Sequence, residues 1–485
     1  MLKSNFSMQR PNGMRGFLMI WLGQVVSGIA SGITAVALPI WIFSITESGT
    51  AVGLLEFFFF ASYLLSVPFA GIIIDRSDRK TMMLVYDFLS LAGLAVLLLL
   101  QSVEALEVWH LYISAALQGV GTAFQSPSYA AAITTMVSKK QYVRANSLLS
   151  LLYEIPGIFG PILAGVMYLV IGLNGILAIN LLAFVISIGV LLFVHVPPPP
   201  KSVEGQQSHS KFLDEAFYGI KYILRRPNLL GLQLIFLTGN LFSGIALSTA
   251  VLYPMVLLRT GNDTQILGTV QSVGALASVL GGVFLTAWGA IKRPARAIIL
   301  GWLISSLFGM TLLGAGQVVW IWLIAVLVDA VFDPIVNVSM DSFLQAKVPP
   351  DLQGRVFSAS DFIAQAMLPF TPLLAGYFGD RILEPAMSTG GTLANMFGWL
   401  VGTGPGSGFG LLIVLCGLGG TLIGLAGYLI PSIRRIDLLM PDFQRLPVIG
   451  LFRRMPPLRT RKHTRKAKRS IHKRVRIRSS RLRGE

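Results

Sequence analysis

Two acidic residues lie one helical turn apart in an otherwise apolar stretch of the sequence. They are Asp329 and Asp333, in the segment IAVLVDAVFDPIVNVSMDSF at residues 324–343. In a helix, side chains four residues apart share one face. If that helix lies in an apolar medium, desolvation and mutual repulsion both favour at least one bound proton on the pair. Such a pair suits a site that binds and releases a proton or another cation.

A structural role for these acids is the alternative. Asp333 precedes Pro334 and could serve only to hydrogen-bond backbone groups that the proline frees, while Asp329 faces a wet outer vestibule. Glu154, in another apolar segment, is a second candidate for binding and releasing a proton or another cation. Three further acids lie nearer the ends of their segments and are expected to reach water: Glu56, Asp87 and Asp361.

Long apolar segments must position these acids. Of the 485 residues, 54% are hydrophobic and only 13% are charged, whereas soluble domains carry about 25% charged residues. Twelve segments are long enough to cross a hydrocarbon core of ~30 Å as helices. They lie near residues 16–44, 51–74, 82–100, 108–136, 147–171, 174–195, 228–257, 265–290, 297–315, 318–343, 356–378 and 408–431. We therefore predict an all-α integral membrane protein with twelve transmembrane helices.

Lysine and arginine determine the predicted orientation. With the amino terminus in the cytoplasm, all but two of the 39 Lys and Arg residues fall on the cytoplasmic side, the exceptions being Arg259 and Arg381. Cytoplasmic loops of membrane proteins are enriched in these residues. Both termini are therefore expected in the cytoplasm, and the protein in the plasma or inner membrane as a multi-pass protein.

A proline-rich break divides the chain. Residues 196–227 begin VPPPPKSVEGQQSHSK, which is typical of an extended linker, and continue as FLDEAFYGIKYILRRP, which is typical of an amphipathic surface helix. Six apolar segments precede the break and six follow it. We predict an N-terminal half at residues 1–195, the linker with its surface helix at 196–227, a C-terminal half at 228–431 and an unstructured basic cytoplasmic tail at 432–485.

The two predicted halves repeat each other. GQVVSGIASGITAVALP at residues 23–39 resembles GNLFSGIALSTAVLYP at residues 239–254. Further along, at one constant offset, Pro161 falls on Pro372 and Gly165 on Gly376. Each helix of the first half therefore pairs with the helix six positions later, in the same orientation. Parallel repeats with a substrate site between them near the membrane midplane are typical of secondary transporters.

The segment after the second apolar stretch reads GIIIDRSDRKTMML and resembles the signature loop G-x-x-x-D-R-x-G-R-[RK] of the major facilitator superfamily. The matching residues are Gly71, Asp75, Arg76, Arg79 and Lys80. Asp78 replaces the usual second glycine, as in the efflux branch that includes macrolide and enterobactin-type siderophore exporters. The resemblance implies that Gly71 lets two helices approach closely and that Asp75 lies at the N-terminus of a neighbouring helix in the inside-closed state. A plain basic turn is the alternative.

The fifth apolar segment contains PGIFGPILAG, which resembles the antiporter motif G-x-x-x-G-P-x-x-G-G of drug exporters. The matching residues are Gly160, Pro161 and Gly165. Pro161 would weaken the local helix hydrogen bonds, and the glycines would permit close, sliding contact between helices. Ordinary packing of small residues is the alternative, because the second half carries the similar TPLLAG.

The resemblance also implies that the first, fourth, seventh and tenth helices line the transport path. Polar residues on them are candidates for contact with substrate: Gln24, Ser27, Gln118, Gln125, Asn240, Ser243 and Asn337. Together with the 29 phenylalanines, they suit a roomy, mostly apolar cavity. We therefore expect no enzyme but a secondary active transporter that exports an amphiphilic small molecule, such as a drug, an antibiotic or a siderophore-like metabolite, by proton-coupled antiport. An ion-independent lipid or lysolipid translocator is the alternative.

No cofactor or metal is expected. The single cysteine, Cys416, excludes an intrachain disulfide and a cysteine metal cluster, and the sequence has no P-loop for ATP. Residues 432–485 hold 18 of the 39 Lys and Arg residues, and we expect this tail to bind anionic lipids. A protein or nucleic-acid partner is the alternative for the tail, although we expect no nucleic acid. We expect a monomer.

Overall fold

The chain is helical through most of the residues that the structure describes. This computed structural model describes residues 13–76, 79–137, 141–196, 219–288, 293–349 and 352–440. The first helices are α1 (Gly13–Thr46), α2 (Gly49–Arg76), α3 (Arg79–Ser102) and α4 (Val108–Met136). Most of the predicted linker, residues 197–218, lies outside the described residues.

The next helix, α5 (Tyr142–Phe193), contains two of the expected apolar segments. Gly172 interrupts it with φ 62° and ψ −172°, a backbone conformation that a residue with a Cβ atom avoids. The interruption falls between the expected segments at 147–171 and 174–195. A glycine in the sequence is therefore what separates them.

The helices of the second half are more broken. Ser248 separates α8 (Pro227–Ala246) from α9 (Thr249–Thr260), and its hydroxyl accepts a hydrogen bond from the backbone N–H of Ala250 at 3.1 Å. Such N-caps satisfy donors that a new helix leaves unpaired. The helices that follow are α10 (Thr264–Trp288), α11 (Pro294–Ile304), a π-helical segment (Ser305–Met310), α12 (Thr311–Ala315), α13 (Val319–Lys347), α14 (Gln353–Gln365), α15 (Thr371–Tyr377), a second π-helical segment (Phe378–Leu383), α16 (Glu384–Met387), α17 (Ala394–Val401) and α18 (Ser407–Leu429).

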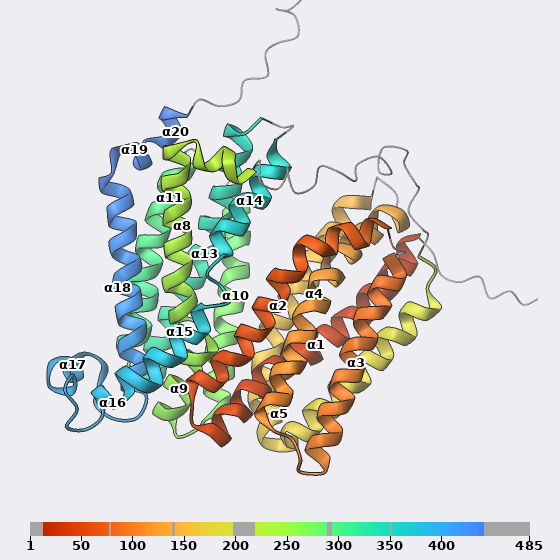
Figure 1. Ribbon diagram of the computed structural model, residues 1–485, viewed down its shortest axis with the longest axis horizontal. Coiled ribbons are helices and arrows are strands. Elements are labelled where there is room, and N and C mark those ends of the chain that lie inside the picture. The colour runs from red at the N-terminus through yellow and green to blue at the C-terminus, as the bar shows by residue number, and fades with distance from the viewer. Residues whose placement is uncertain are drawn as a thin grey trace, which may run out of the picture. The chain divides into compact units, whose positions relative to one another are not determined.

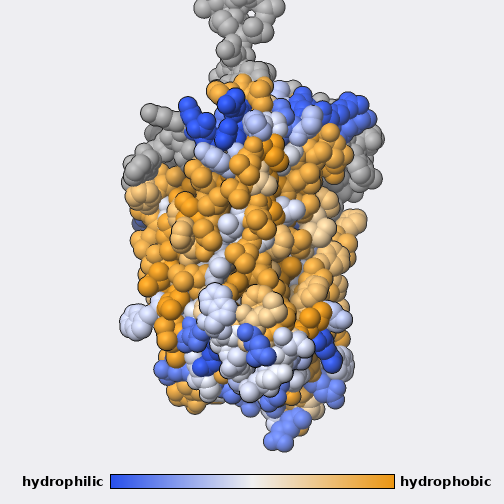
Figure 2. All heavy atoms as spheres, turned by 90° about the vertical axis from the view of Figure 1, so that its left-hand side faces the viewer, coloured by the Kyte–Doolittle hydropathy of each residue, from blue (hydrophilic) through white to orange (hydrophobic). Residues whose placement is uncertain are grey.

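The length and apolar composition of its helices identify this as a membrane protein. Within the described ranges, nine helical stretches are long and apolar enough to cross a bilayer, and the one at Glu154–Phe193 has 40 residues. Figure 2 shows one face of the molecule, on which a broad apolar band separates hydrophilic residues at the two ends. Such a band, bounded by polar ends, is what a hydrocarbon core requires.

Part of the predicted tail is folded. Residues 432–440 were expected to be unstructured, but they contribute to two short helices, α19 (Pro431–Arg434) and α20 (Ile436–Leu439). Ile436 is fully buried, and Lys347 at the end of α13 donates a hydrogen bond to the carbonyl of Asp437 at 2.7 Å. The expectation was wrong for these residues because apolar side chains in this segment pack against the helix ends. Residues 441–485 lie outside the described residues.

The two halves touch most extensively along two helix pairs. α2 packs against α15, and α5 packs against α10 (Figure 1). Gly165 of α5 lies so close to α10 that a Cβ atom on it would be 2.5 Å from the carbonyl oxygen of Thr264. Gly376 of α15 lies equally close to α2, where a Cβ atom would be 2.5 Å from the Cα of Thr50. We call the contacts of these two helix pairs the outer seam, because the orientation expected from the sequence places them towards the outside.

Candidate transport site

The acids of α13 lie in different surroundings. Asp329 is partly buried and accepts a hydrogen bond from the hydroxyl of Ser305, the first residue of the π-helical segment. Gly309 of that segment packs directly on α13, because a Cβ atom there would lie 2.7 Å from the Cβ of Asp329. Short π-helical segments are frequent at functional sites. Here the segment supplies one donor to a membrane carboxylate.

Asp333 is the more exposed member of the pair. Its Oδ1 accepts a hydrogen bond from Nδ2 of Asn337, one turn further along α13, at 3.1 Å. Asn337 was expected on the transport path, and the structure places it beside Asp333. The expected one-face arrangement of the two acids is also found, since both line one cavity.

Two cavities surround this face of α13. The Asp329 cavity has about 720 Å³ of empty space, and its polar lining residues include Ser243, Ser305, Asp329 and Asp333. The Asp361 cavity has about 1100 Å³, and its polar lining residues are Asn240, Ser243, Asp333, Asn337, Asp341, Ser360, Asp361 and Gln365. Because Ser243 and Asp333 line both, the cavities adjoin at this acid.

The structure therefore brings together five of the predicted residues: Asp329, Asp333, Asn240, Ser243 and Asn337. Asn240 also donates a hydrogen bond to the carbonyl of Ala364 at 2.9 Å. Asp341 was missed, although its spacing from Asn337 is the same four residues that link Asp329 to Asp333. Asp361 was expected to reach water, and it is exposed at the cavity wall.

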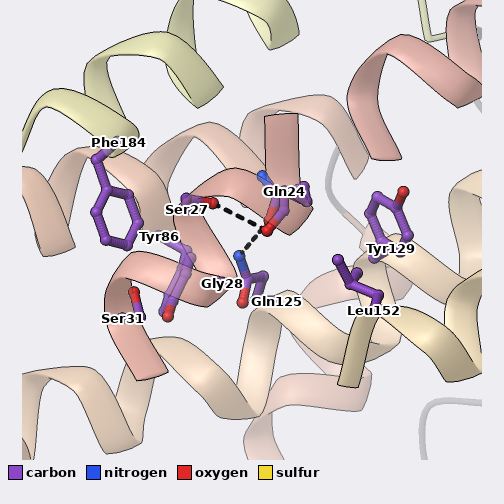
Figure 3. Close-up of a pocket in the computed structure, with 9 residues that line it drawn as sticks. All are labelled: Gln24, Ser27, Gly28, Ser31, Tyr86, Gln125, Tyr129, Leu152 and Phe184. Atoms are coloured by element: carbon purple, nitrogen blue, oxygen red, sulfur yellow. Dashed lines mark hydrogen bonds between the residues drawn. The ribbon is translucent and has the colours of Figure 1, made fainter. Parts of the chain in front are cut away.

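A third cavity lies in the N-terminal half (Figure 3). It has about 480 Å³ of empty space and is lined by Gln24, Ser27, Gly28, Ser31, Tyr86, Gln125, Tyr129, Leu152 and Phe184. Nε2 of Gln125 donates a hydrogen bond to Oε1 of Gln24 at 3.0 Å. Three predicted path residues, Gln24, Ser27 and Gln125, are thus found together. Gln118 is not with them, because it lines a separate small cavity with Ser90 and Ser114.

Asp87 corrects an expectation. It was expected to reach water, but it is 0% exposed. Its carboxylate accepts hydrogen bonds from Nε2 of Gln24 at 3.1 Å and from the hydroxyl of Ser187 at 3.2 Å. Nε2 of Gln125 lies 3.4 Å from its other oxygen. Four helical segments therefore contribute to one buried polar network, which neutral donors stabilise.

Of the other predicted residues, the structure describes the surroundings of Glu154 and Lys80. Glu154 is exposed and lines neither the Asp329 cavity nor the Asp361 cavity. Lys80 donates hydrogen bonds to the carbonyls of Leu192 and Val194 at 3.2 and 2.7 Å, so it joins α3 to the end of α5. The structure does not describe the burial or contacts of the other loop-motif residues: Gly71, Asp75, Arg76 and Arg79.

Two of the three residues of the α5 motif lie at the outer seam. Gly160 packs on Gly32 of α1, Pro161 packs on Gly268 of α10, and Gly165 packs on Thr264. The repeat-related Pro372 packs in the same way on Gly53 of α2. All three motif residues are therefore close helix contacts, and two of them join the halves.

Carboxylates add to the contact between halves. Asp380 accepts hydrogen bonds from the hydroxyl of Ser48 at 2.7 Å and from the backbone N–H groups of Gly49 and Thr50 at 2.8 and 2.6 Å. Glu56 of α2 in turn accepts a hydrogen bond from the hydroxyl of Ser248 at 2.8 Å. Each half thus supplies an acid to the N-terminus of a helix from the other half, where the helix dipole favours negative charge.

Replacing Asp380 by asparagine is expected to weaken this contact, which would hold the two halves together on the outer side. One amide oxygen cannot replace a carboxylate that accepts three hydrogen bonds, and hydrogen bonds to charged groups contribute about 1.5–3 kcal/mol. In a background that combines Cys416→Ser with Ala250→Cys, Asp380→Asn should raise labelling of the introduced thiol by an impermeant reagent from outside. Asp263→Asn is the matched control, because Asp263 caps α10 within its own half. Equal labelling in both variants would contradict a closing role for Asp380.

Comparison with known proteins agrees with these features. The family model described as Major Facilitator Superfamily matches residues 20–372. Macrolide efflux protein A of Streptococcus pyogenes is 26% identical over 373 residues, covering 76% of this chain and 90% of that protein. Enterobactin exporter EntS of Citrobacter koseri is 24% identical over 346 residues, covering 70% and 79%. Multidrug efflux pump Tap of Mycolicibacterium fortuitum is 24% identical over 384 residues, covering 76% and 90%.

Solved structures share the fold. A bacterial homolog of the human lysosomal transporter Spinster, in an inward-facing and unoccupied conformation, superimposes with a TM-score of 0.62 at 17% identity, covering 87% of this chain and 97% of that one. The nucleoside transporter NupG superimposes with a TM-score of 0.59 at 12% identity, covering 85% and 98%. The family model, which matches most of the chain, confirms the resemblance to this family, and the chain belongs to the Major Facilitator Superfamily of membrane transporters.

Proposed function

We propose that this transporter exports an amphiphilic small molecule by alternating access, in antiport with protons. The observation that carries the proposal is the pair Asp329 and Asp333 on one face of α13, where both line one cavity and Asp333 also lines a second. The distant relatives named as macrolide, enterobactin and multidrug exporters support the export direction and the substrate range.

Alternating access needs one closed end and one open end. The outer seam and the Asp380 contacts support closure at the end of the molecule that carries α16 and α17 (Figure 1). The polar face of α13 runs the other way, from Asp329 through Asp333 and Asn337 to Asp341, towards the end of α13 at Lys347. A substrate entering from that side would meet Asp341 first and the acid pair last.

The pair would couple the two fluxes by competition. When the site faces outward, a proton binds, because two close carboxylates in low dielectric favour sharing one. When it faces inward, the proton leaves to the more alkaline cytoplasm and the substrate takes its place. Proton and substrate do not occupy the pair together. Each change from outward-facing to inward-facing therefore carries a proton in, and each change back carries substrate out.

Reconstituted transport tests the proposal. The full chain is placed in proteoliposomes, and a radiolabelled macrolide is offered with and without a pH gradient. Uptake should accelerate several-fold when the compartment receiving the macrolide is acidic, and nigericin should remove the acceleration. Transport of a fluorescent lysolipid that is insensitive to the gradient and to nigericin would instead favour the ion-independent lipid translocator.

We also propose twelve spans, arranged as two six-helix halves, with both termini in the cytoplasm. In a Cys416→Ser background, Thr389→Cys in the 379–407 segment should react with an impermeant thiol reagent applied to intact cells, because Thr389 is exposed. Ser470→Cys in the basic tail should react only after the cells are permeabilised. Labelling of the Ser470→Cys variant in intact cells would overturn the orientation and, with it, the proposal that the tail binds anionic lipids of the cytoplasmic leaflet.

A further inference from the structure

The cavities beside α13 carry charge of one sign only among the described residues that line them. Four acids do so: Asp329, Asp333, Asp341 and Asp361. None of the described lining residues of these two cavities is Lys, Arg or His. A cleft with charge of one sign and walls of low dielectric concentrates ions of the opposite sign. An anion would therefore meet repulsion along the whole of this path.

The two central acids are not neutralised by the groups that hold them. Asp329 accepts its hydrogen bond from the hydroxyl of Ser305, and Asp333 accepts one from the amide of Asn337. Both donors are neutral, so they orient the carboxyl groups without balancing their charge. A bound proton or a bound cation is the remaining way to balance it.

The rest of the lining suits an apolar body. Leu247, Trp302, Met310, Phe332 and Val336 line the Asp329 cavity, and Phe236 lines the Asp361 cavity. Aromatic faces within reach of a cation attract it, and the attraction grows as water is excluded. The same walls would therefore accept both the apolar part and the diffuse charge of a lipophilic cation.

The cavity of the N-terminal half differs in charge. Its polar lining residues are neutral, namely Gln24, Ser27, Ser31, Tyr86, Gln125 and Tyr129. The buried Asp87 does not line it; Gln24 and Gln125 both donate hydrogen bonds to that carboxylate. A substrate with one charged end would therefore place that end in the C-terminal half.

We infer that the substrate is a lipophilic cation, such as an amphiphile with a protonated amine, whose positive group binds at Asp329 and Asp333, and that anionic amphiphiles are rejected. This inference rests on the proposed function, whose acid pair it uses, and it names the charge of the exported molecule. It separates the amine-type drugs from acidic, siderophore-like metabolites as candidate substrates.

Tetraphenylphosphonium and tetraphenylborate provide the test, because they are nearly equal in size and opposite in charge. Each is measured by equilibrium dialysis against the full-length protein in nanodiscs, with binding to empty nanodiscs subtracted. The phosphonium should bind at least about tenfold more tightly than the borate, in keeping with the enrichment of counter-ions in a one-sign cleft. Equal affinities, tighter binding of the borate, or no binding of the phosphonium would overturn the inference.

Variants locate the site. Asp329→Asn combined with Asp333→Asn should lower phosphonium affinity at least about tenfold and leave borate affinity unchanged or raised. Glu104→Gln, at an exposed acid outside both cavities, is the matched control. If the double variant does not fold, the wild-type comparison of the two ions still decides. Charge-selective binding without gradient-driven transport would contradict only the antiport proposal, and gradient-driven transport without charge selectivity would contradict only this inference.

Discussion

Asp333→Asn is expected to abolish efflux driven by a pH gradient while leaving downhill counterflow of the substrate largely intact. The amide cannot take up and release a proton at this position, so the gradient no longer drives the transport cycle. Substrate exchange needs only binding and reorientation. Asp329 keeps one carboxylate for the positive group of the substrate, and asparagine preserves the shape of the side chain at this position and its hydrogen bond with Asn337. Both activities are measured in proteoliposomes with a radiolabelled macrolide.

Asp329→Asn should have a similar effect, because the two acids line one cavity. Asp341→Asn is the control: this acid lines the Asp361 cavity but not the Asp329 cavity, so its loss should preserve gradient dependence. If Asp329→Asn and Asp333→Asn both transport with the wild-type response to the gradient, the pair has a structural role. Glu154 would then be the next residue to test.

The pairing along α13 was predictable because it depends on one helix alone. A spacing of four residues places Asp329, Asp333 and Asn337 on one face whatever surrounds them. The donor to Asp329 was not predictable, because Ser305 reaches it from a π-helical segment that no periodicity in the sequence indicates. The partner of a buried acid on another helix depends on packing, which a single sequence does not contain.

The burial of Asp87 was not predictable either, because it also depends on how the helices pack. Its position near one end of its apolar segment suggested contact with water, yet three neighbouring helices cover it completely. The residues that bind it, Gln24, Gln125 and Ser187, lie far apart in the sequence. Gln118 and Gln125 are seven residues apart on α4, but Gln125 faces Gln24 of α1, whereas Gln118 faces α3. The burial of Asp87 and the separation of Gln118 from Gln125 both depend on which neighbouring helix packs against each helix face.

The internal repeat predicted which residues occupy equivalent positions in the two halves. It aligned Pro161 with Pro372 and Gly165 with Gly376, and in the structure both members of each pair lie at the outer seam. Small residues let membrane helices approach closely. The repeat alone could not show that these glycines face the other half rather than a neighbour in their own half. Their contact with backbone atoms across the seam makes them sensitive positions for closure.

Gly165→Leu is therefore expected to prevent closure of the outer seam and to reduce transport strongly, and Gly376→Leu should do the same from the other pair of helices. The atoms that a new Cβ would meet belong to the backbone of Thr264 and Thr50, so no side-chain rotation relieves the clash. Overpacking of this kind costs about 1–3 kcal/mol. Applied to the outside-closed state alone, that cost shifts the conformational equilibrium about 5- to 150-fold.

The shift is measured as labelling of Ala250→Cys from outside in the Cys416→Ser background, alongside transport in proteoliposomes. Labelling should rise and transport should fall in both leucine variants. Gly189→Leu is the matched control, since that glycine is exposed and a Cβ on it would have no heavy atom within 4 Å. Gel filtration of each variant separates a closure defect from misfolding. If Gly165→Leu and Gly376→Leu fold, transport and label as the wild type does, the seam does not control access from outside, and the motif in α5 serves only to pack helices.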